Sequence, residues 1–270
     1  MSPAPAALYH ALRPGDGPVA LLLLHPLGAD LRFWDAFVAA WDRPEPVVAC
    51  DLRGVGGSPG PGRPVGFAEH VADLEDLRLR LGFDRLVPVG CAIGAMVAAC
   101  YAAAHPDRAA ALVLANPGVR TVPAARAVIA DRVALVRDGG MRAILPGAVD
   151  RAFAAQPRDA RHARYLAMFG AQSAEAYALA ALAVLDADVS SELARVECPT
   201  LVVAGAHDAL FPSDQAREVQ ALVRGSRLEI DPDAAHFVPY QNPAGFRDRV
   251  TAFLGAVTGA GKDPAMRSAS

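Results

Sequence analysis

Three positions of the chain follow the order in which some enzymes place a nucleophile, an acid and a base, but the first of them has no reactive group. Ala92 lies at the centre of Gly90-Cys91-Ala92-Ile93-Gly94. Small residues two before and two after a central residue allow a sharp turn that exposes the central side chain, usually a nucleophile, at the end of a strand. The segment therefore predicts a turn that aims a nucleophile but carries only a methyl group.

An aspartate and a histidine supply the other two positions. Asp208 comes shortly after the apolar run 201–204, and His236 follows the short run 228–230. With residue 92 they have the chain order nucleophile, acid, base. We predict that Asp208 fixes the tautomer of the His236 imidazole, which then serves as a general base. Taken singly, each residue has a plainer interpretation, as a satisfied core histidine and as a turn-forming aspartate.

Two backbone amides complete the predicted chemistry. Leu27 follows an apolar run in His25-Pro26-Leu27-Gly28, and Ile93 follows Ala92. Their N–H groups would form an oxyanion hole, the pair of donors that stabilises the negative oxygen of a reacting carbonyl group. The alternative is an ordinary turn between a strand and a helix. The glycine-rich segment 51–58 lacks both dinucleotide and phosphate-loop spacing, so we interpret it as a structural loop.

Cys91 is the thiol nearest to the predicted turn. If Cys91 were the centre of the turn, Val89 and Ile93 would occupy the positions that require small residues. We therefore predict that the Cys91 side chain points away from the site and does not replace the missing nucleophile.

Other side chains are candidates for contacts with a substrate. We predict that His25, Phe153 and Phe169 line the binding site. Three arginines could bind a substrate carboxylate, or else are solvated or paired on a helix face; they are Arg132, Arg137 and Arg142. The remaining histidines have no matching position, and most are expected at the surface; they are His10, His70, His105, His162 and His207.

A parallel sheet is needed to bring these residues together, and the chain has the apolar runs for one. Runs typical of strands buried on both faces are residues 19–24, 47–50, 86–89, 111–115, 201–204 and 228–230. Apolar residues at helical spacing predict helices over residues 31–41, 67–81, 95–105 and 243–257. The alternation predicts an α/β fold with a mostly parallel, doubly wound sheet, whose ligands bind at the carboxyl ends of the strands.

The middle of the chain has a purely helical pattern. Four helices are predicted over residues 124–137, 141–155, 161–169 and 174–185. So many successive helices are more than one connection between two parallel strands requires, so we interpret residues 118–197 as a cap over the sheet edge. Residues 1–117 and 198–258 would then form the core. Residues 259–270 are predicted to be a flexible tail. The alternative is that these helices cover a face of the sheet like any others.

The composition limits the class of protein. Of 270 residues, 53% are hydrophobic and 20% are charged, which excludes a disordered chain. A net charge of −3 gives no basic field for nucleic acid, and no run is long enough for a bilayer. Four cysteines without C-x-x-C spacing predict reduced, buried thiols and a cytoplasmic protein; they are Cys50, Cys91, Cys100 and Cys198. We expect a small-molecule substrate and no metal or organic cofactor, and a homodimer stays open.

Taken together, these motifs resemble the α/β-hydrolase superfamily over residues 19–257. Within it, the chain looks most like 3-oxoadipate enol-lactonases and related small esterases. The stretches that carry the resemblance are His25-Pro26-Leu27-Gly28, Asp51-Leu52-Arg53-Gly54, residues 112–116, residues 198–205 and Ala235-His236-Phe237. The resemblance implies a hydrolase of a small ester, lactone or 1,3-dicarbonyl compound. Ala92 replaces the serine of the family, and Ala152-Phe153 stands where that family has a tryptophan-phenylalanine pair.

Three hypotheses account for the alanine. In the first, His236 and Asp208 act on water or on an acidic substrate proton without a side-chain nucleophile. In the second, the alanine replaces the serine of an esterase or lactonase and traps its substrate. In the third, the protein binds a ligand or partner and catalyses nothing.

Overall fold

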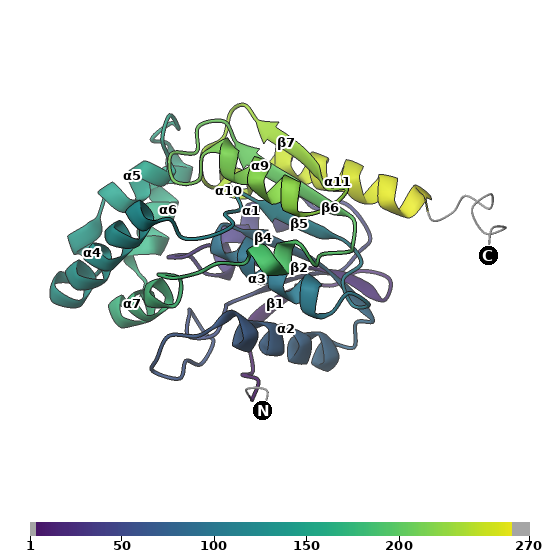
Figure 1. The fold of residues 1–270 in the computed structure, drawn as a ribbon, viewed down its shortest axis with the longest axis horizontal. Helices are drawn as coiled ribbons and strands as arrows, with labels where there is room; N and C mark the ends of the chain where they lie inside the picture. The colour runs from purple at the N-terminus through teal and green to yellow at the C-terminus, as the bar shows by residue number, and fades with distance from the viewer. Residues whose placement is uncertain (1–3, 261–270) are drawn as a thin grey trace.

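A seven-stranded sheet forms the centre of the molecule (Figure 1). The structure is a computed structural model and describes residues 4–260. The strand order is β1-β3-β2-β4-β5-β6-β7, with β1 antiparallel to β3 and every other pair parallel. The strands are β1 (His10–Arg13), β2 (Val19–Leu24), β3 (Val47–Cys50), β4 (Arg85–Cys91), β5 (Leu112–Ala115), β6 (Thr200–Gly205) and β7 (Arg227–Asp231). The predicted α/β fold with a mostly parallel sheet is confirmed.

Helices cover both faces of this sheet, because successive side chains of a strand point to opposite sides. Leu21 and Leu23 of β2 belong to one hydrophobic core with residues of α1 (Asp35–Ala40) and α11 (Pro243–Ala260). Leu22 and Leu24 face the other way and belong to a second core. The helices of this second core are α2 (Phe67–Leu81), α3 (Ile93–Ala104), α8 (Ser190–Leu193) and α9 (Ser213–Leu222).

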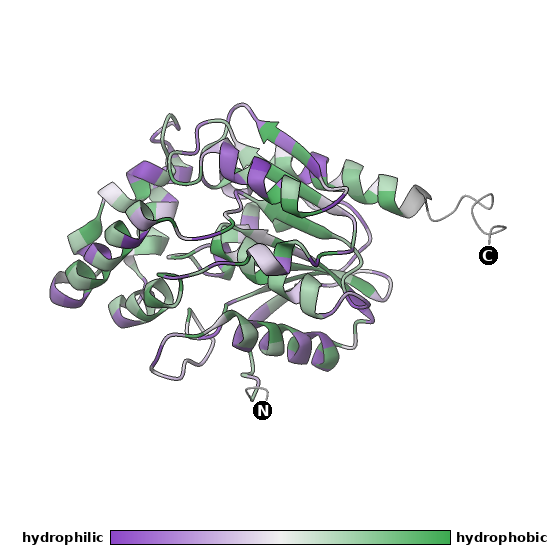
Figure 2. Cartoon of the chain, in the orientation of Figure 1, coloured by the Kyte–Doolittle hydropathy of each residue, from purple (hydrophilic) through white to green (hydrophobic). Residues whose placement is uncertain are grey.

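The hydropathy of the elements matches these two cores. Figure 2 shows green, hydrophobic colour concentrated on the strands, and bands of purple and green alternating along α2. Leu74 and Leu77 form the buried side of α2, which ends where Gly82 adopts a φ of 73°. Only glycine adopts that left-handed backbone without strain, so Gly82 stops the helix at the predicted residue.

A group of helices lies together beside the sheet, at the left of Figure 1. It contains α4 (Pro123–Gly139), the 3₁₀ turn η2 (Met141–Ile144), α5 (Gly147–Ala152), α6 (Ala160–Gly170) and α7 (Ala174–Ala183). The predicted range 118–197 also includes α8, which packs in the second core of the sheet. The division into core and cap stays a prediction. Of the predicted tail, residues 259 and 260 are helical, and residues 261–270 lie outside the described residues.

Some predicted elements differ from the structure. Residues 141–155 are not one helix, because Pro146 has no N–H to donate and the chain breaks there between η2 and α5. Residues 31–41 begin with a 3₁₀ turn, η1 (Leu31–Trp34), before α1. The strand β1 and the helices α8, α9 and α10 (Val238–Gln241) were not predicted.

Two predictions concern the surroundings of the protein. Within residues 4–260, no helix is long and apolar enough to cross a bilayer. The four cysteines are free thiols; three are buried, and Cys198 is only partly buried. The cytoplasmic location and the oligomeric state stay predictions.

Candidate active site

The predicted turn is present between β4 and α3. Ala92 has a φ of 52° and a ψ of −113°, a backbone conformation that strains a residue with a side chain. A Cβ atom on Gly90 would lie 2.1 Å from the Gly94 oxygen, and one on Gly94 would lie 2.3 Å from the Leu24 oxygen. The glycines are therefore required by close backbone approach. The chain keeps a strained turn whose central side chain is a methyl group.

His236 and Asp208 form a buried pair beyond the ends of the strands. The Nδ1 atom of His236 lies 3.0 and 2.9 Å from the two carboxylate oxygens of Asp208. Asp208 also accepts hydrogen bonds from the Leu210 and Phe211 N–H groups, both at 2.8 Å. Burial raises the pKa of the Asp208 carboxyl group, but the charge and hydrogen bond of His236 and these two amides outweigh it and lower that pKa below its ordinary value. Because Nδ1 of His236 is hydrogen-bonded to Asp208, Nε2 is the ring nitrogen that remains for proton transfer.

Two amide side chains that sequence reasoning did not assign hold the histidine loop in place. Asn116 donates to an Asp208 oxygen at 3.0 Å and to the Ala235 oxygen at 2.9 Å, and it accepts from the Val238 N–H at 3.0 Å. Gln241 accepts from the Ala235 N–H at 2.8 Å. The signal for Asn116 was its place directly after a buried strand, like the other candidates. The sequence around Gln241 has no such signal.

One cavity brings most of the predicted residues together. It has a volume of about 330 Å³, and Ala92, His236, Leu27, Ile93 and Phe169 all line it. Within residues 4–260, neither the Leu27 N–H nor the Ile93 N–H donates a hydrogen bond. Both amides therefore have free hydrogen-bonding capacity beside the cavity that contains the His236 ring.

Two residues predicted to contact a substrate have other surroundings. Phe153 does not line this cavity; its ring packs 5.3 Å from the Tyr165 ring and 5.1 Å from the His162 ring. His25 is buried, its Nδ1 donates to the Pro26 oxygen at 2.9 Å, and its Nε2 accepts from the Leu52 N–H at 3.0 Å. Burial lowers the pKa of His25, in keeping with a neutral ring. With both nitrogens occupied, His25 positions the Leu27 loop and offers no hydrogen bond to a ligand.

The cavity is mostly apolar, with positive charge at its wall. Arg132 and Arg151 line it, and neither forms an ion pair with another residue of the range 4–260. Arg137, in contrast, is paired with Glu175 at 2.9 Å, and Arg142 does not line the cavity. Of the three arginines suggested by the sequence, only Arg132 is placed for a ligand carboxylate, and Arg151 was missed. The described residues contain no cluster of His, Cys, Asp and Glu that could hold a metal ion.

Comparison with known proteins shows the family to which this fold belongs. Residues 19–152 match the family model described as the alpha/beta hydrolase fold. RutD of Klebsiella pneumoniae, named as a candidate carbamate hydrolase, is 30% identical over 230 residues, covering 83% of this chain and 86% of that protein. The chain belongs to the α/β-hydrolase family.

Solved α/β-hydrolase structures extend the likeness to almost the whole chain. A hydrolase from Pseudomonas aeruginosa is 31% identical with a TM-score of 0.84, covering 93% of this chain and 95% of that chain. The enol-lactonase from Burkholderia xenovorans is 27% identical with a TM-score of 0.85, covering 92% and 96%. The predicted resemblance to α/β-hydrolases is confirmed, and the chain is a hydrolase of the α/β-hydrolase fold.

Cys91 does not substitute for the serine of an α/β-hydrolase. Its thiol is completely buried, and its Sγ atom lies 3.9 Å from the His236 backbone oxygen rather than on the cavity. Burial raises the pKa of the Cys91 thiol, so the reactive thiolate is disfavoured. The prediction that this side chain points away from the site agrees with the structure.

A second cavity, with a volume of about 260 Å³, adjoins the first. The residues that line both cavities are Pro26, Leu27, Ile93, Tyr177 and Val184. His25 and His70 line the second cavity only. His70 and His162 were expected at the surface, but both are buried, because each lies on the inner side of a helix.

Proposed function

We propose that this α/β-hydrolase cleaves a small, negatively charged ester, lactone or carbamate with water as the nucleophile, using His236 as the general base. One observation carries the proposal: the His236 ring, hydrogen-bonded to Asp208, lines the same cavity as Ala92 and the free amides of Leu27 and Ile93. The helices α4–α7 would act as a cap that keeps bulk water out of this cavity. A methyl group at position 92 leaves room for a water molecule where a serine oxygen would otherwise stand.

The reaction follows from these positions. The Nε2 atom of His236 takes a proton from water while the water oxygen bonds to the carbonyl carbon. The carbonyl electron pair moves onto its oxygen, and the N–H groups of Leu27 and Ile93 stabilise that charge. Asp208 stabilises the imidazolium. When the tetrahedral intermediate collapses, the bond to the leaving group breaks, and the leaving group takes the proton back from His236, giving an acid and an alcohol or amine.

The charge and apolar character of the cavity support the substrate class. Arg132, which interacts with the Tyr177 hydroxyl, and Arg151 form no ion pair with the other described residues. They lie at the wall of a cavity that is otherwise mostly apolar, which favours a ligand with a carboxylate on a short carbon chain. The printed names of similar proteins, a candidate carbamate hydrolase and an enol-lactonase, both describe attack on a carbonyl group.

Replacing the base tests the mechanism. We expect His236→Gln to lower kcat/KM by about 10²- to 10⁴-fold on any accepted substrate, because it removes proton transfer and leaves the amides in place. The measurement is turnover of p-nitrophenyl esters, monoalkyl succinates, lactones and carbamates by both proteins. Unchanged turnover on every accepted substrate would show that the histidine is not the base.

Restoring the hydroxyl group tests the alternatives. We expect Ala92→Ser to raise ester turnover by roughly 10³-fold or more, and to react with a fluorophosphonate probe, since the new oxygen lies beside His236. A second candidate function, ligand binding without catalysis, is favoured by the methyl group of Ala92. It predicts tight binding and no product, so any product formation that depends on His236 excludes it.

A further inference from the structure

The main chain of His236 is held by the helical group α4–α7. The His236 N–H donates to the Ala152 carbonyl oxygen at 3.2 Å. Ala152 is the last residue of α5, and the last carbonyl groups of a helix have no partner within that helix. The proposed base therefore supplies one of the hydrogen bonds that α5 lacks at its end.

Gln241 connects the same carbonyl group to both neighbours of His236. Its Oε1 atom accepts from the N–H groups of Ala235 and Phe237, at 2.8 and 3.2 Å. Its Nε2 atom donates to the Ala152 oxygen at 3.0 Å. Three consecutive N–H groups are therefore all bound, either by this side chain or by the end of the helix. We call Gln241 and Ala152 the clamp.

Burial makes the clamp firm. Gln241 and Ala152 are 5% and 2% exposed, so water does not replace their hydrogen bonds. Ala152 and the preceding Arg151 line the cavity of His236, whereas Gln241 does not. Gln241 can therefore affect a reaction in this cavity only through the position of other residues.

The ring of His236 is held by a different residue from those that hold its main chain. Asp208 accepts from Nδ1 at 2.9 Å, and the clamp binds the main chain. Holding the residue at two points fixes where its remaining ring nitrogen, Nε2, lies. A misplacement of about 1 Å in a reacting group can lower a rate about 10²-fold.

We propose that Gln241 is a positioning residue for His236. Gln241 joins the end of α5 to the main chain on both sides of the histidine, so the place of the helical group sets the place of Nε2. The role of His236 as a base rests on the proposed function. The clamp itself is tested by a measurement that needs no turnover.

The proton on Nδ1 of His236 reports how firmly this residue is held. The ionised Asp208 carboxylate only accepts hydrogen bonds, so Nδ1 carries the proton between them. Proton NMR identifies its signal by comparison with His236→Gln and measures its exchange with water. We expect Gln241→Met to speed this exchange about 10- to 100-fold, because local opening then breaks fewer hydrogen bonds. An unchanged rate would overturn the proposal.

Turnover of p-nitrophenyl butyrate gives a second readout. We expect Gln241→Met to lower kcat about 10- to 100-fold and to change KM less than about twofold, because the base is misplaced while the residues that line the cavity stay the same. A change in KM alone would contradict a positioning role.

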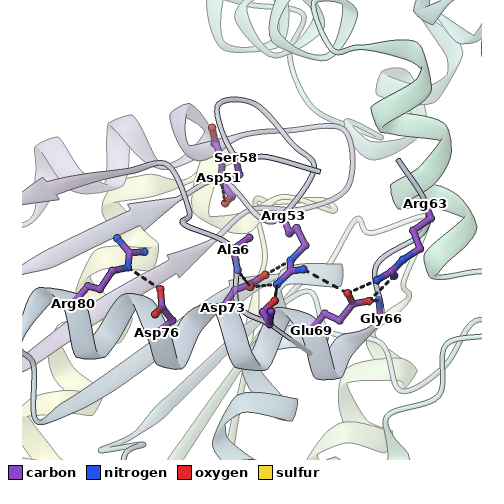
Figure 3. Close-up of polar contacts among 11 residues, drawn as sticks. Ala6, Asp51, Arg53, Ser58, Arg63, Gly66, Glu69, Asp73, Asp76 and Arg80 are labelled. Atoms are coloured by element: carbon purple, nitrogen blue, oxygen red, sulfur yellow. Dashed lines mark hydrogen bonds and ion pairs between the residues drawn. The ribbon is translucent and has the colours of Figure 1, made fainter. Parts of the chain in front are cut away.

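A buried side chain of α2 provides the matched control. Asp73 is fully buried, and it accepts from the Ala6 N–H and from Nε of Arg53, each at 2.7 Å (Figure 3). Of the described residues that line the cavity of His236, none belongs to α2. We expect Asp73→Asn to lower the Tm and to leave the exchange rate and kcat unchanged. If it changed both as much as Gln241→Met does, lost stability alone would explain the effect and the proposal would fail.

A second variant tests the bond to the helical group by itself. In Gln241→Glu, a carboxylate still accepts from the N–H groups of Ala235 and Phe237 but donates nothing to Ala152. This variant keeps two of the three hydrogen bonds, so it also serves if Gln241→Met does not fold. We expect exchange about 3- to 10-fold faster and kcat lower by a similar factor. Values equal to those of the unmodified chain would show that α5 does not position the histidine.

The two readouts separate this proposal from the proposed function. Faster exchange in Gln241→Met, together with turnover that ignores His236→Gln, would support the clamp and reject the mechanism. Turnover that depends on His236, with no response of either readout to Gln241→Met, would reject the clamp and keep the mechanism.

Discussion

The carboxyl edge of the sheet and the helical group α4–α7 face the same cavity but make polar contacts of different kinds. At the sheet edge, Asn116, Asp208 and His236 are 1%, 6% and 6% exposed and bond to one another. On the helical group, the ion pair of Arg126 and Asp186 joins side chains that are 53% and 77% exposed. Desolvated hydrogen bonds fix the proposed chemistry, whereas the helices depend mainly on apolar packing.

The largest effect expected from this difference is at Asn116. Asn116→Ala removes three buried hydrogen bonds and places alanine at a φ of 46°, so we expect a loss of about 3 kcal/mol in the free energy of unfolding. Urea denaturation measures it. Asn116→Gly tolerates the backbone and should recover about 1 kcal/mol. A loss below about 1 kcal/mol for the alanine variant would show that this edge is no more firmly held than the helices.

A pH series extends the comparison to His70 of α2, a helix that packs in the second core of the sheet. Folded His70 stays neutral down to a pKa of about 4, but the unfolded chain takes up that proton near 6.5. The unfolded state therefore binds more protons in this window, and stability falls as the pH drops through it, by about 3 kcal/mol in total. We expect His70→Leu to lack this loss. Parallel stability curves for the two proteins between pH 7.5 and 4 would contradict the expected burial.

A smaller effect concerns the strained turn. Ala92→Gly relieves a positive φ, so we expect the free energy of unfolding to rise by about 0.5–1 kcal/mol. Ala95→Gly in the same helix, at an ordinary helical position, should lower it by about 1 kcal/mol. If both variants lost stability equally, the turn would store no strain.

The smallest effect belongs to the helical group. Arg126→Ala removes an exposed ion pair and should change the free energy of unfolding by less than about 0.5 kcal/mol, because solvent screens both charges. Thermal denaturation at two salt concentrations measures it. A loss comparable to that of Asn116→Ala would remove the contrast between the two regions.

The pattern of apolar residues was sufficient to predict the elements that are buried on both sides. The runs 19–24 and 47–50 coincide with β2 and β3 because a continuous apolar run suits only a covered strand. β1 was missed because His10–Arg13 is short, has no continuous apolar run and lies at an exposed edge of the sheet. The proline at position 146 itself indicates a break, but apolar residues at helical spacing on both sides of it led to the prediction of a single helix.

The order of the residues along the chain was sufficient to predict that Asp208 and His236 lie at the same edge of the sheet, since each follows a strand of that sheet. It could not distinguish Phe153, which directly follows α5, from Phe169 of α6, because both are aromatic and only packing decides which of them meets the cavity. The contact of Gln241 with Ala152 joins residues far apart in the sequence. No local pattern encodes it.

The position of α7 has a consequence for altering specificity. Tyr177 of α7 and Val184, which directly follows α7, line both cavities and so form part of the wall between them. The residues of α4 line only one cavity. Changes on α4 should therefore alter the preference for one substituent at a time. A change on α7 would move the dividing wall itself, so that what one compartment gains in space the other loses.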